Sequence, residues 1–394
     1  MDHSTKTKSH KQTDLTCSQY NEMYNRALHS HAWLLDIERF IPSEYHPEDL
    51  ECIPEIGLDD GNESDEEGSD GRRMTLTLTN VQNVTNICFV TVWDVDLCGR
   101  DGVVLQSGWN ETQQDDIRKR RKCTTFIVLC PPQTFVHLCY LAPHQFLLCD
   151  SDENDEDNSV RVPLSSWSQV EIESDIQPWS SHENINDEHS TLIHFPFKGL
   201  AEEPLPTHDN ERSIASIEQK SCYQCIQSEN GQLTHFFHGN YHAIDFACPI
   251  GTPLYSPVNG VVIHVCDNAQ VSGIAATNLF HWNSILIRAD EASNDNSFSK
   301  KPLYIEYVHI QSKSCVIQPG ESVTKGQLLC KSGSVGFSPT PHLHLGAYRS
   351  GGDGAASVRV RFELYMNEGR DSFLPVAGGW YDEFGLVQEN RLGS

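Results

Sequence analysis

Short runs of alternating apolar residues, separated by turn-forming residues, constrain the fold of this chain more than any other feature. In one region, about residues 73–175, apolar side chains alternate with threonines or form short continuous stretches. Gly, Pro, Asn and Asp separate these stretches, which is typical of β-strands joined by turns. The pattern predicts a mainly β protein with a β-sandwich-like domain in this region. The clearest runs are residues 74–78, 87–93, 126–129 and 135–138.

The length of 394 residues exceeds that of a typical single domain, which has about 100–200 residues. Apolar positions at a period near 3.6 predict a short N-terminal helix from about residue 15 to 40. Residues 58–71 are acidic and rich in Gly and Ser, so we expect a disordered linker there. The predicted divisions are residues 1–72 (helix plus acidic linker), 73–175 (β-rich accessory domain), 176–220 (linker), 221–365 (second β domain) and 366–394 (C-terminal extension).

The chain is strongly acidic, with 28 Lys and Arg against 55 Asp and Glu and a formal net charge of -27. Contacts to phosphate groups need clusters of Lys and Arg, so this balance argues against binding to nucleic acid or to an anionic membrane surface. The one basic cluster, residues 118–122, is short and lies in a polar stretch. We interpret it as a solvated loop.

The sequence contains no run of about eighteen apolar residues, so we expect no membrane span. The first ten residues carry charges with no apolar core behind them, unlike a secretory signal. The 14 cysteines are scattered along the chain, as in a reduced protein. We therefore expect a cytoplasmic protein, with secretion by another route as the alternative. The oligomeric state is left open.

Histidines gather in the second β region together with one aspartate. His342 and His344 are two residues apart in a strand-like run, so both side chains project from the same face. His309 ends another apolar strand, and residues 234–255 contain three histidines and Asp245. Two histidines and one aspartate, with one position left open for water, are a common ligand set for catalytic zinc.

Several segments of this region occur in an order that is found in a known family. They are Tyr241-His-Ala-Ile-Asp-Phe246, Pro249-Ile-Gly-Thr-Pro253, Tyr307-Val-His309, the turn-rich residues 316–327 and Pro341-His-Leu-His344. Together they resemble the lysostaphin-type zinc endopeptidases, whose bacterial members cut peptide cross-bridges in peptidoglycan. The resemblance covers about residues 235–350 and implies a C-terminal peptidase domain with an open β-sheet core and the metal on its concave face. It also implies that Asp245 and His344 bind zinc, while His309 and His342 lie near the open coordination site.

The first zinc ligand is the point at which the chain departs from the family. The family's usual zinc histidine stands four residues before the aspartate, and here that position is Tyr241. Family members with a lengthened segment look closer to this chain, and by comparison with them we predict His238. His242 would face the opposite side of a regular strand and would need a β-bulge to reach the metal. It remains an alternative, as do His235 and the absence of a ligand from this segment.

A zinc finger is the rival interpretation of some of these residues. Cys222 and Cys225, followed by His235 and His238, have the right residue types. The spacing is wrong, because nine residues separate the pairs and two separate the histidines, against about 12–15 and 3–5 in zinc fingers. A free or disulfide-bonded β-turn pair is the simpler interpretation of the two cysteines.

The resemblance predicts a zinc-dependent endopeptidase that acts on glycine-rich peptides or on peptidoglycan cross-bridges. No glutamate of the His-Glu-x-x-His kind is present, so His309 and His342 are the predicted acid–base pair. One would take a proton from water, and the other would stabilise the oxyanion. The alternatives are a peptidase fold that binds or regulates without catalysis, and a structural or interaction protein dominated by the N-terminal regions.

Overall fold

The chain forms two compact units in the computed structural model, Met1–Ser180 with Gln270–His281 and Ser181–Ala269 with Trp282–Ser394. Among the described residues, no helix is both long enough and apolar enough to cross a membrane. The structure describes residues 32–35, 55–59, 75–84, 86–99, 102–105, 107–114, 117–130, 132, 134–143, 145–149, 160–164, 167–178, 191–198, 222–229, 234–235, 239–290, 301–352, 355–364 and 371–387.

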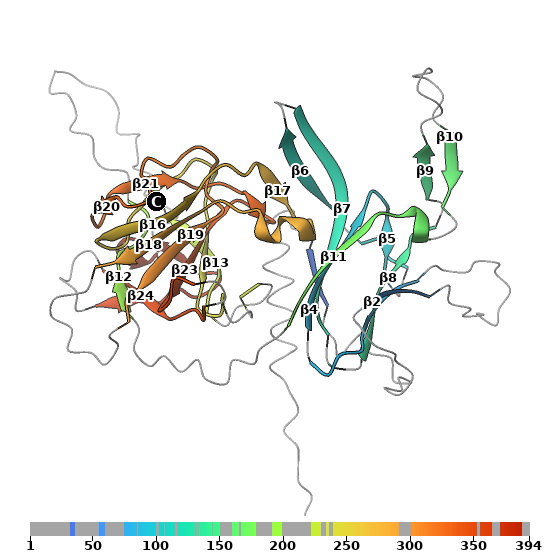
Figure 1. Ribbon diagram of the computed structural model, residues 1–394, viewed down its shortest axis with the longest axis horizontal. Helices are drawn as coiled ribbons and strands as arrows, with labels where there is room; N and C mark the ends of the chain where they lie inside the picture. The colour runs from blue at the N-terminus through green and yellow to red at the C-terminus, as the bar shows by residue number, and fades with distance from the viewer. Residues whose placement is uncertain are drawn as a thin grey trace, which may run out of the picture. The chain divides into compact units, whose positions relative to one another are not determined.

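Two β-sheets dominate the N-terminal unit (Figure 1). One has the strand order β2-β3-β8-β5, and the other contains the order β11-β4-β7-β6-β17 with β1 beside β7. The first sheet contains β2 (Glu55–Asp59), β3 (Thr75–Asn80), β5 (Leu97–Cys98) and β8 (Thr134–Leu141). The second contains β1 (Ala32–Leu35), β4 (Asn86–Trp93), β6 (Gly108–Gln114), β7 (Ile117–Cys130), β11 (Ile172–Pro178) and β17 (Val271–Gly273). The unit also contains the pair β9 (Phe146–Cys149) and β10 (Val160–Pro163) and the short 3-10 helices η2 (Trp167–Gln169) and η3 (Ala276–Phe280).

Residues from both sheets share one hydrophobic core. The core-facing side chains recur with period two, as in Leu76 and Leu78 of β3 and in Phe126 and Val128 of β7. Two sheets that face each other across such a core form a β-sandwich-like domain. The mainly β prediction is therefore confirmed, and each of the four apolar runs singled out in this region contains a strand.

The structure differs from the sequence predictions at two places in this unit. Residues 32–35, inside the predicted N-terminal helix, form β1 and pair in parallel with β7, while the rest of that helix lies outside the described residues. The basic residues 118–122 are not a loop but part of β7, paired with β6. The charge of this stretch is partly balanced, because Arg121 lies 2.6 Å from Asp94 and 2.8 Å from Glu171 on adjacent segments.

Residues 270–281 belong to the N-terminal unit, although in the sequence they lie between strands β16 and β18 of the C-terminal unit. In this segment β17 pairs with β6, and Ile274, Ala275 and Ala276 are buried. The amide of Asn278 donates to Oδ1 of Asn110 at 2.6 Å, and both side chains are buried. Residues 270–281 are therefore an integral part of the N-terminal fold.

A nine-stranded sheet dominates the C-terminal unit (Figure 1). Its order is β20-β16-β18-β19-β23-β14-β13-β26-β27, and the strand pairs along it are antiparallel. Its strands are β13 (Tyr223–Gln227), β14 (Ile244–Ala247), β16 (Gly260–Cys266), β18 (Ser284–Ala289), β19 (Tyr304–Val308), β20 (Ser322–Val323), β23 (His342–Tyr348), β26 (Trp380–Asp382) and β27 (Gly385–Leu386). Smaller elements are β12 (Thr191–Ile193), β15 (Pro253–Tyr255), β21 (Leu328–Lys331), β22 (Gly336–Phe337), β24 (Val360–Glu363) and β25 (Ser372–Phe373).

The two faces of this sheet carry different residues, and the division positions the site. On β23, Leu343, Leu345 and Ala347 point into the core of the unit. The alternate residues of the same strand, including His342 and His344, point to the opposite face. Histidines singled out in the sequence meet the aspartate on that face.

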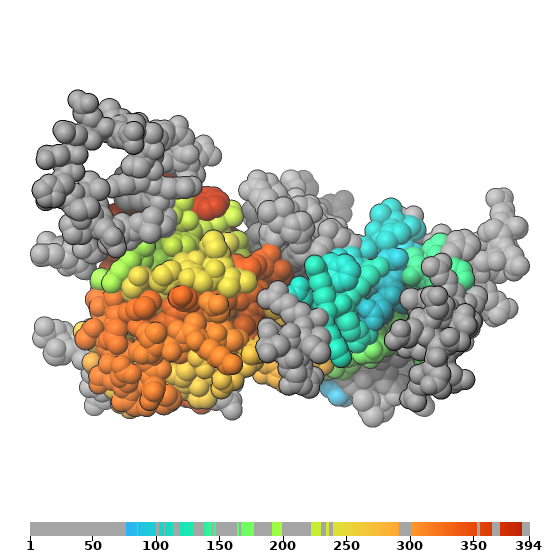
Figure 2. All heavy atoms as spheres, turned by 90° about the horizontal axis from the view of Figure 1, so that it is seen from above, coloured from blue at the N-terminus to red at the C-terminus, as the bar shows by residue number. Residues whose placement is uncertain are grey.

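The segment around β12 covers part of the core. Figure 2 shows this green segment packed against the yellow residues of the C-terminal unit. Backbone hydrogen bonds fix it there: the amide of Tyr255 donates to Pro196, and the amide of His194 donates to Pro257. Phe195 and Phe197 thereby enter the core.

Candidate metal centre

Asp245 and His344 form the base of the site on two adjacent strands. They are direct cross-strand partners of β14 and β23, and Oδ1 of Asp245 lies 2.8 Å from Nδ1 of His344. Both side chains are almost fully buried, with 1% and 6% of their surface exposed. An ionised carboxylate is costly to bury alone, so this pairing indicates that positive charge gathers around Asp245.

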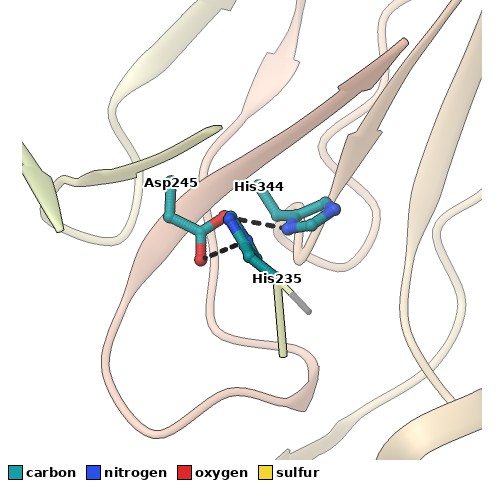
Figure 3. Close-up of side chains that lie close together, drawn as sticks. All are labelled: His235, Asp245 and His344. Atoms are coloured by element: carbon teal, nitrogen blue, oxygen red, sulfur yellow. Dashed lines mark hydrogen bonds and ion pairs between the residues drawn. The ribbon is translucent and has the colours of Figure 1, made fainter. Parts of the chain in front are cut away.

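His235 is the third member of the group (Figure 3). Its Nε2 lies 3.2 Å from Oδ2 of Asp245, and its ring lies 5.2 Å from that of His344 between centroids. Its other nitrogen, Nδ1, faces the backbone carbonyl of Ser228 at 3.3 Å. Because a carbonyl can only accept, Nδ1 carries the proton and Nε2 presents a lone pair toward Asp245.

The donor set fits a zinc ion. One ligand atom from each of His235, Asp245 and His344 can be chosen so that all three lie within 4.8 Å of one another. Nε2 of His235 is buried and makes no aligned hydrogen bond, although it points at the carboxylate. A buried nitrogen without a partner is costly, and a cation between these three side chains would satisfy it. Imidazole and carboxylate groups in this number are typical of a catalytic zinc site with an open position.

His342 and His309 lie beside the group. Nε2 of His342 lies 3.6 Å from Oδ2 of Asp245, and the rings of His342 and His309 are 4.5 Å apart between centroids. Nδ1 of His342 donates to the carbonyl of Thr340 at 2.7 Å, and Nδ1 of His309 donates to that of Val335 at 2.7 Å. In both rings Nε2 is therefore the nitrogen that is left to accept a proton.

The turn at His309 is held in a sparsely populated backbone conformation. His309 has a φ of 62°, in the left-handed region that non-glycine residues rarely occupy. A Cβ on Gly333 would lie 2.7 Å from the carbonyl oxygen of His309 and 2.7 Å from the backbone nitrogen of Gln311. Only glycine fits there, and Gly333 also bridges to His342. This close approach brings His309 beside His342.

The charges of the site shift the pKa values in opposite directions. Burial alone would raise the pKa of Asp245, but the surrounding His235, His342 and His344 hold it well below its usual range. Burial lowers the pKa of His309 well below its ordinary value, and the neighbouring His342 and His344 lower it further. Burial lowers the pKa of His342 as well, despite the opposing effect of Asp245. For His344 the Asp245 carboxylate outweighs burial, so its pKa is raised.

The predicted first ligand cannot be placed, because His238 lies outside the described residues. Of the two alternatives, His235 belongs to the group and His242 points elsewhere, with its Nδ1 3.4 Å from Glu229. Periodicity did not single out His235, since it lies ten residues before Asp245 and outside β14. The Ser228 carbonyl that orients it is visible only in three dimensions.

The zinc-finger alternative finds no support in the fold. Cys225 is fully buried in the hydrophobic core, where its thiol donates to the carbonyl of Gln227. Burial raises the pKa of Cys225 well above its usual value, and burial also raises that of Cys222. Cys225 thus packs in the core, while His235 faces Asp245.

Comparison with known proteins agrees with this geometry. Residues 239–356 match the model of Peptidase family M23. The chain carries an M23 peptidase domain. The matched residues include Asp245, His309, His342 and His344. His235 lies four residues before residue 239, where the match begins. The resemblance to the lysostaphin-type family is confirmed.

Individual relatives cover about a quarter to a third of this chain. Peptidoglycan DD-endopeptidase ShyA of Vibrio cholerae is 27% identical over 104 residues, which are 26% of this chain and 19% of ShyA. The catalytic domain of the antimicrobial peptidase lysostaphin from Staphylococcus simulans is 22% identical, with a TM-score of 0.24, over 34% of this chain and 86% of that domain. The catalytic domain of the prophage-encoded M23 protein EnpA from Enterococcus faecalis is 23% identical, with a TM-score of 0.24, over 35% of this chain and 88% of that domain.

Proposed function

We propose that the M23 domain is a zinc-dependent endopeptidase that hydrolyses peptide bonds of peptidoglycan. The observation that carries this proposal is the buried group of His235, Asp245 and His344, flanked by two histidines whose Nδ1 atoms are held by backbone carbonyls. A structural metal site would be closed by a fourth protein ligand, whereas catalytic sites keep one position open. The match to family M23 and the likeness to ShyA support the same reaction class.

His235, Asp245 and His344 would hold the zinc ion. When bound, zinc supplies Lewis acidity for the peptide carbonyl and lowers the pKa of water toward neutrality. Asp245 contributes one negative charge to this donor set, so the site keeps a net positive charge. The neighbouring histidines therefore remain neutral and able to accept protons.

His309 and His342 are the proposed acid–base pair. Each has Nδ1 tied to a backbone carbonyl, which fixes the tautomer and directs Nε2 away from that bond. Their depressed pKa values keep both rings neutral near pH 7, so one Nε2 can accept the proton of the attacking water. The same ring can then donate that proton to the leaving amine. Because its Nδ1 proton is held by a backbone carbonyl, the second histidine would stabilise the negative charge on the carbonyl oxygen only with a proton on its Nε2 as well.

The substrate class is proposed from the relatives. ShyA is named as a peptidoglycan DD-endopeptidase and lysostaphin as an antimicrobial peptidase. We infer that this domain cuts short peptides of peptidoglycan, with glycine-rich cross-bridges as the simplest model substrate. A peptidase fold that binds such peptides without cutting them is the second candidate.

Zinc content and hydrolysis, measured together on the full chain, test the proposal. The purified protein would be assayed for zinc by mass spectrometry and for cleavage of peptidoglycan and of pentaglycine, before and after chelation. We expect about one zinc per chain, cleavage of at least one substrate, loss of cleavage on chelation and recovery on adding zinc. Asp245→Asn should abolish both zinc and cleavage, whereas Asp290→Asn, at an exposed aspartate of the same unit, should change neither. Zinc without cleavage would favour the binding module, and a protein that takes up no zinc would overturn the proposal.

A further inference from the structure

We propose that Arg359 and Glu229 are positioning residues that hold His235 in place for the metal. The inference rests on the proposed zinc site, since it concerns how the first ligand of that site is fixed. Neither residue is among the three side chains that could hold the metal. It acts through the backbone beside His235.

The ion pair between these two residues is bidentate and partly buried. Nε of Arg359 donates to Oε2 of Glu229 at 2.5 Å, and Nη2 donates to Oε1. The side chains are 31% and 18% exposed. Two parallel hydrogen bonds between a planar guanidinium and a carboxylate fix both orientation and distance, more firmly than a single contact does.

Glu229 is connected to His235 through the peptide group between Ser228 and Glu229. Its neighbour Ser228 accepts from Nδ1 of His235 at 3.3 Å, the contact that leaves Nε2 directed at Asp245. A metal-ligating histidine commonly uses its second nitrogen in this way, and the partner sets both tautomer and ring orientation. If Glu229 moved, the Ser228 carbonyl would move with it.

The same few residues also hold the far end of the segment that carries His235. The amide of His242 donates to Oγ of Ser357 at 3.0 Å, and Nδ1 of His242 lies 3.4 Å from Oε2 of Glu229. Ser357 forms a β-bridge with Tyr348, the last residue of β23. Glu229 and His242, which lie on either side of His235 in the sequence, are therefore both held by residues 357–359, a stretch that itself pairs with the end of β23.

This arrangement also assigns a role to His242, which sequence spacing left as an alternative zinc ligand. His242 is buried with its Nδ1 near the Glu229 carboxylate. It therefore belongs to the ion pair of Arg359 and Glu229, which we call the clamp, and not to the metal group. Glu229 thus faces one guanidinium and one imidazole. Partial burial alone would raise the pKa of Glu229, but His242 and Arg359 lower it to about 2.

The C-terminal unit contains a matched control for this clamp. Glu363 likewise faces one cation and one histidine, with Nζ of Lys325 at 3.0 Å and Nε2 of His194 at 3.0 Å. Among the described residues, Lys325 and Glu363 pair with each other and are not part of the metal group. Breaking this second pair removes an ion pair of similar exposure, with a single contact, without touching the path to His235.

Zinc affinity of the full chain, freed of metal by dialysis against a chelator, is the measurement that tests the inference. Zinc would be titrated in competition with a chromophoric chelator, at a temperature where circular dichroism shows every variant folded. We expect Arg359→Met to raise the Kd for zinc about tenfold or more, the range seen when outer partners of ligands are removed. Arg359→Lys should restore part of the loss, because lysine keeps the charge but only one contact. Lys325→Met should leave the Kd unchanged.

Glu229→Gln keeps the shape of the side chain and provides a second route if Arg359→Met fails to fold. The double variant with both Glu229→Gln and Arg359→Met should have a Kd for zinc no higher than that of the weaker-binding single variant, since the two residues act as one unit. A Kd for Glu229→Gln or Arg359→Met equal to that of the parent, with the unfolding midpoint alone reduced, would overturn the inference. A parent protein that binds no zinc would instead overturn the proposed function.

Discussion

Asp245 and His344 lie directly opposite each other on β14 and β23, and 2.8 Å separates Oδ1 of the aspartate from Nδ1 of the histidine. The register of two antiparallel strands therefore fixes this half of the centre. A slip of one residue would turn both side chains to the apolar face, where Phe246 and Leu345 now pack. The core that these neighbours form thus enforces the geometry of the ligands.

His235, the proposed first ligand, lies in a turn outside the strands, and substitution of each candidate histidine tests its assignment. We expect His235→Ala to lower the zinc content of the purified chain well below one per molecule, because Asp245 and His344 alone hold zinc weakly. His242→Ala should retain zinc, since its ring faces Glu229. His238→Ala is measured beside them. Full zinc in His235→Ala together with its loss in His238→Ala would transfer the ligand role to His238.

The proposed acid–base histidines should separate chemistry from metal binding. His309→Ala and His342→Ala are each expected to lower kcat by about 10²-fold or more, the usual contribution of general acid–base catalysis. Zinc content should stay near that of the parent, because neither ring belongs to the group of ligands. Single-turnover cleavage with parallel zinc analysis measures both quantities. Unchanged kcat in either variant would remove that residue from the mechanism.

Gly333 controls the distance between these two histidines. The Cβ of an alanine would meet the backbone at His309 and Gln311 at 2.7 Å, far inside van der Waals contact. We expect Gly333→Ala to displace the His309 turn and reduce kcat by at least tenfold, while zinc remains bound. Gly320→Ala is the control, because a Cβ there meets nothing within 4 Å. Because Gly320 has a φ of 87°, an alanine there strains the backbone without any steric clash, so this variant shows the effect of strain alone.

The parts of the site that lie on strands could be predicted from the sequence. Alternation places His342 and His344 on one face of a strand, and family motifs order Asp245 and His309 around them. The structure brings these four together. Strand periodicity is a strong local rule, and buried apolar neighbours enforce it.

The parts that depend on loops or on distant pairing could not be predicted. His235 is oriented by the Ser228 carbonyl, and His242 is held by Ser357, contacts that no spacing rule encodes. Likewise residues 32–35 have a helical pattern but form β1, because pairing with β7 outweighs weak local propensity. Tertiary contacts decide such segments.

Glu229 should give the protein an acid-sensitive component of stability. Its pKa falls from an ordinary 4.5 to about 2 in the folded chain, since Arg359 and His242 favour the carboxylate. The resulting stabilisation is present above about pH 4.5 and is lost as the pH falls toward 2. Urea unfolding midpoints of the C-terminal unit should therefore drop more steeply between these pH values in the parent than in Glu229→Gln. Parallel curves for the two proteins would contradict the assigned ion pair.

Asn278 tests whether residues 270–281 are structural for the N-terminal unit. Its amide donates to the buried Oδ1 of Asn110, so Asn278→Ala leaves a buried acceptor without its partner. Such a loss costs about 1–3 kcal/mol, and we expect a lower unfolding midpoint of the N-terminal unit. Zinc content should be unaffected. Thr277→Ala, at an exposed neighbour of the same short helix, serves as the control, because it removes only a solvent-exposed hydrogen bond to Glu173. Fluorescence and hydrogen exchange can follow the two units separately, and equal protection of β6 in both variants would show that the segment is dispensable to that fold.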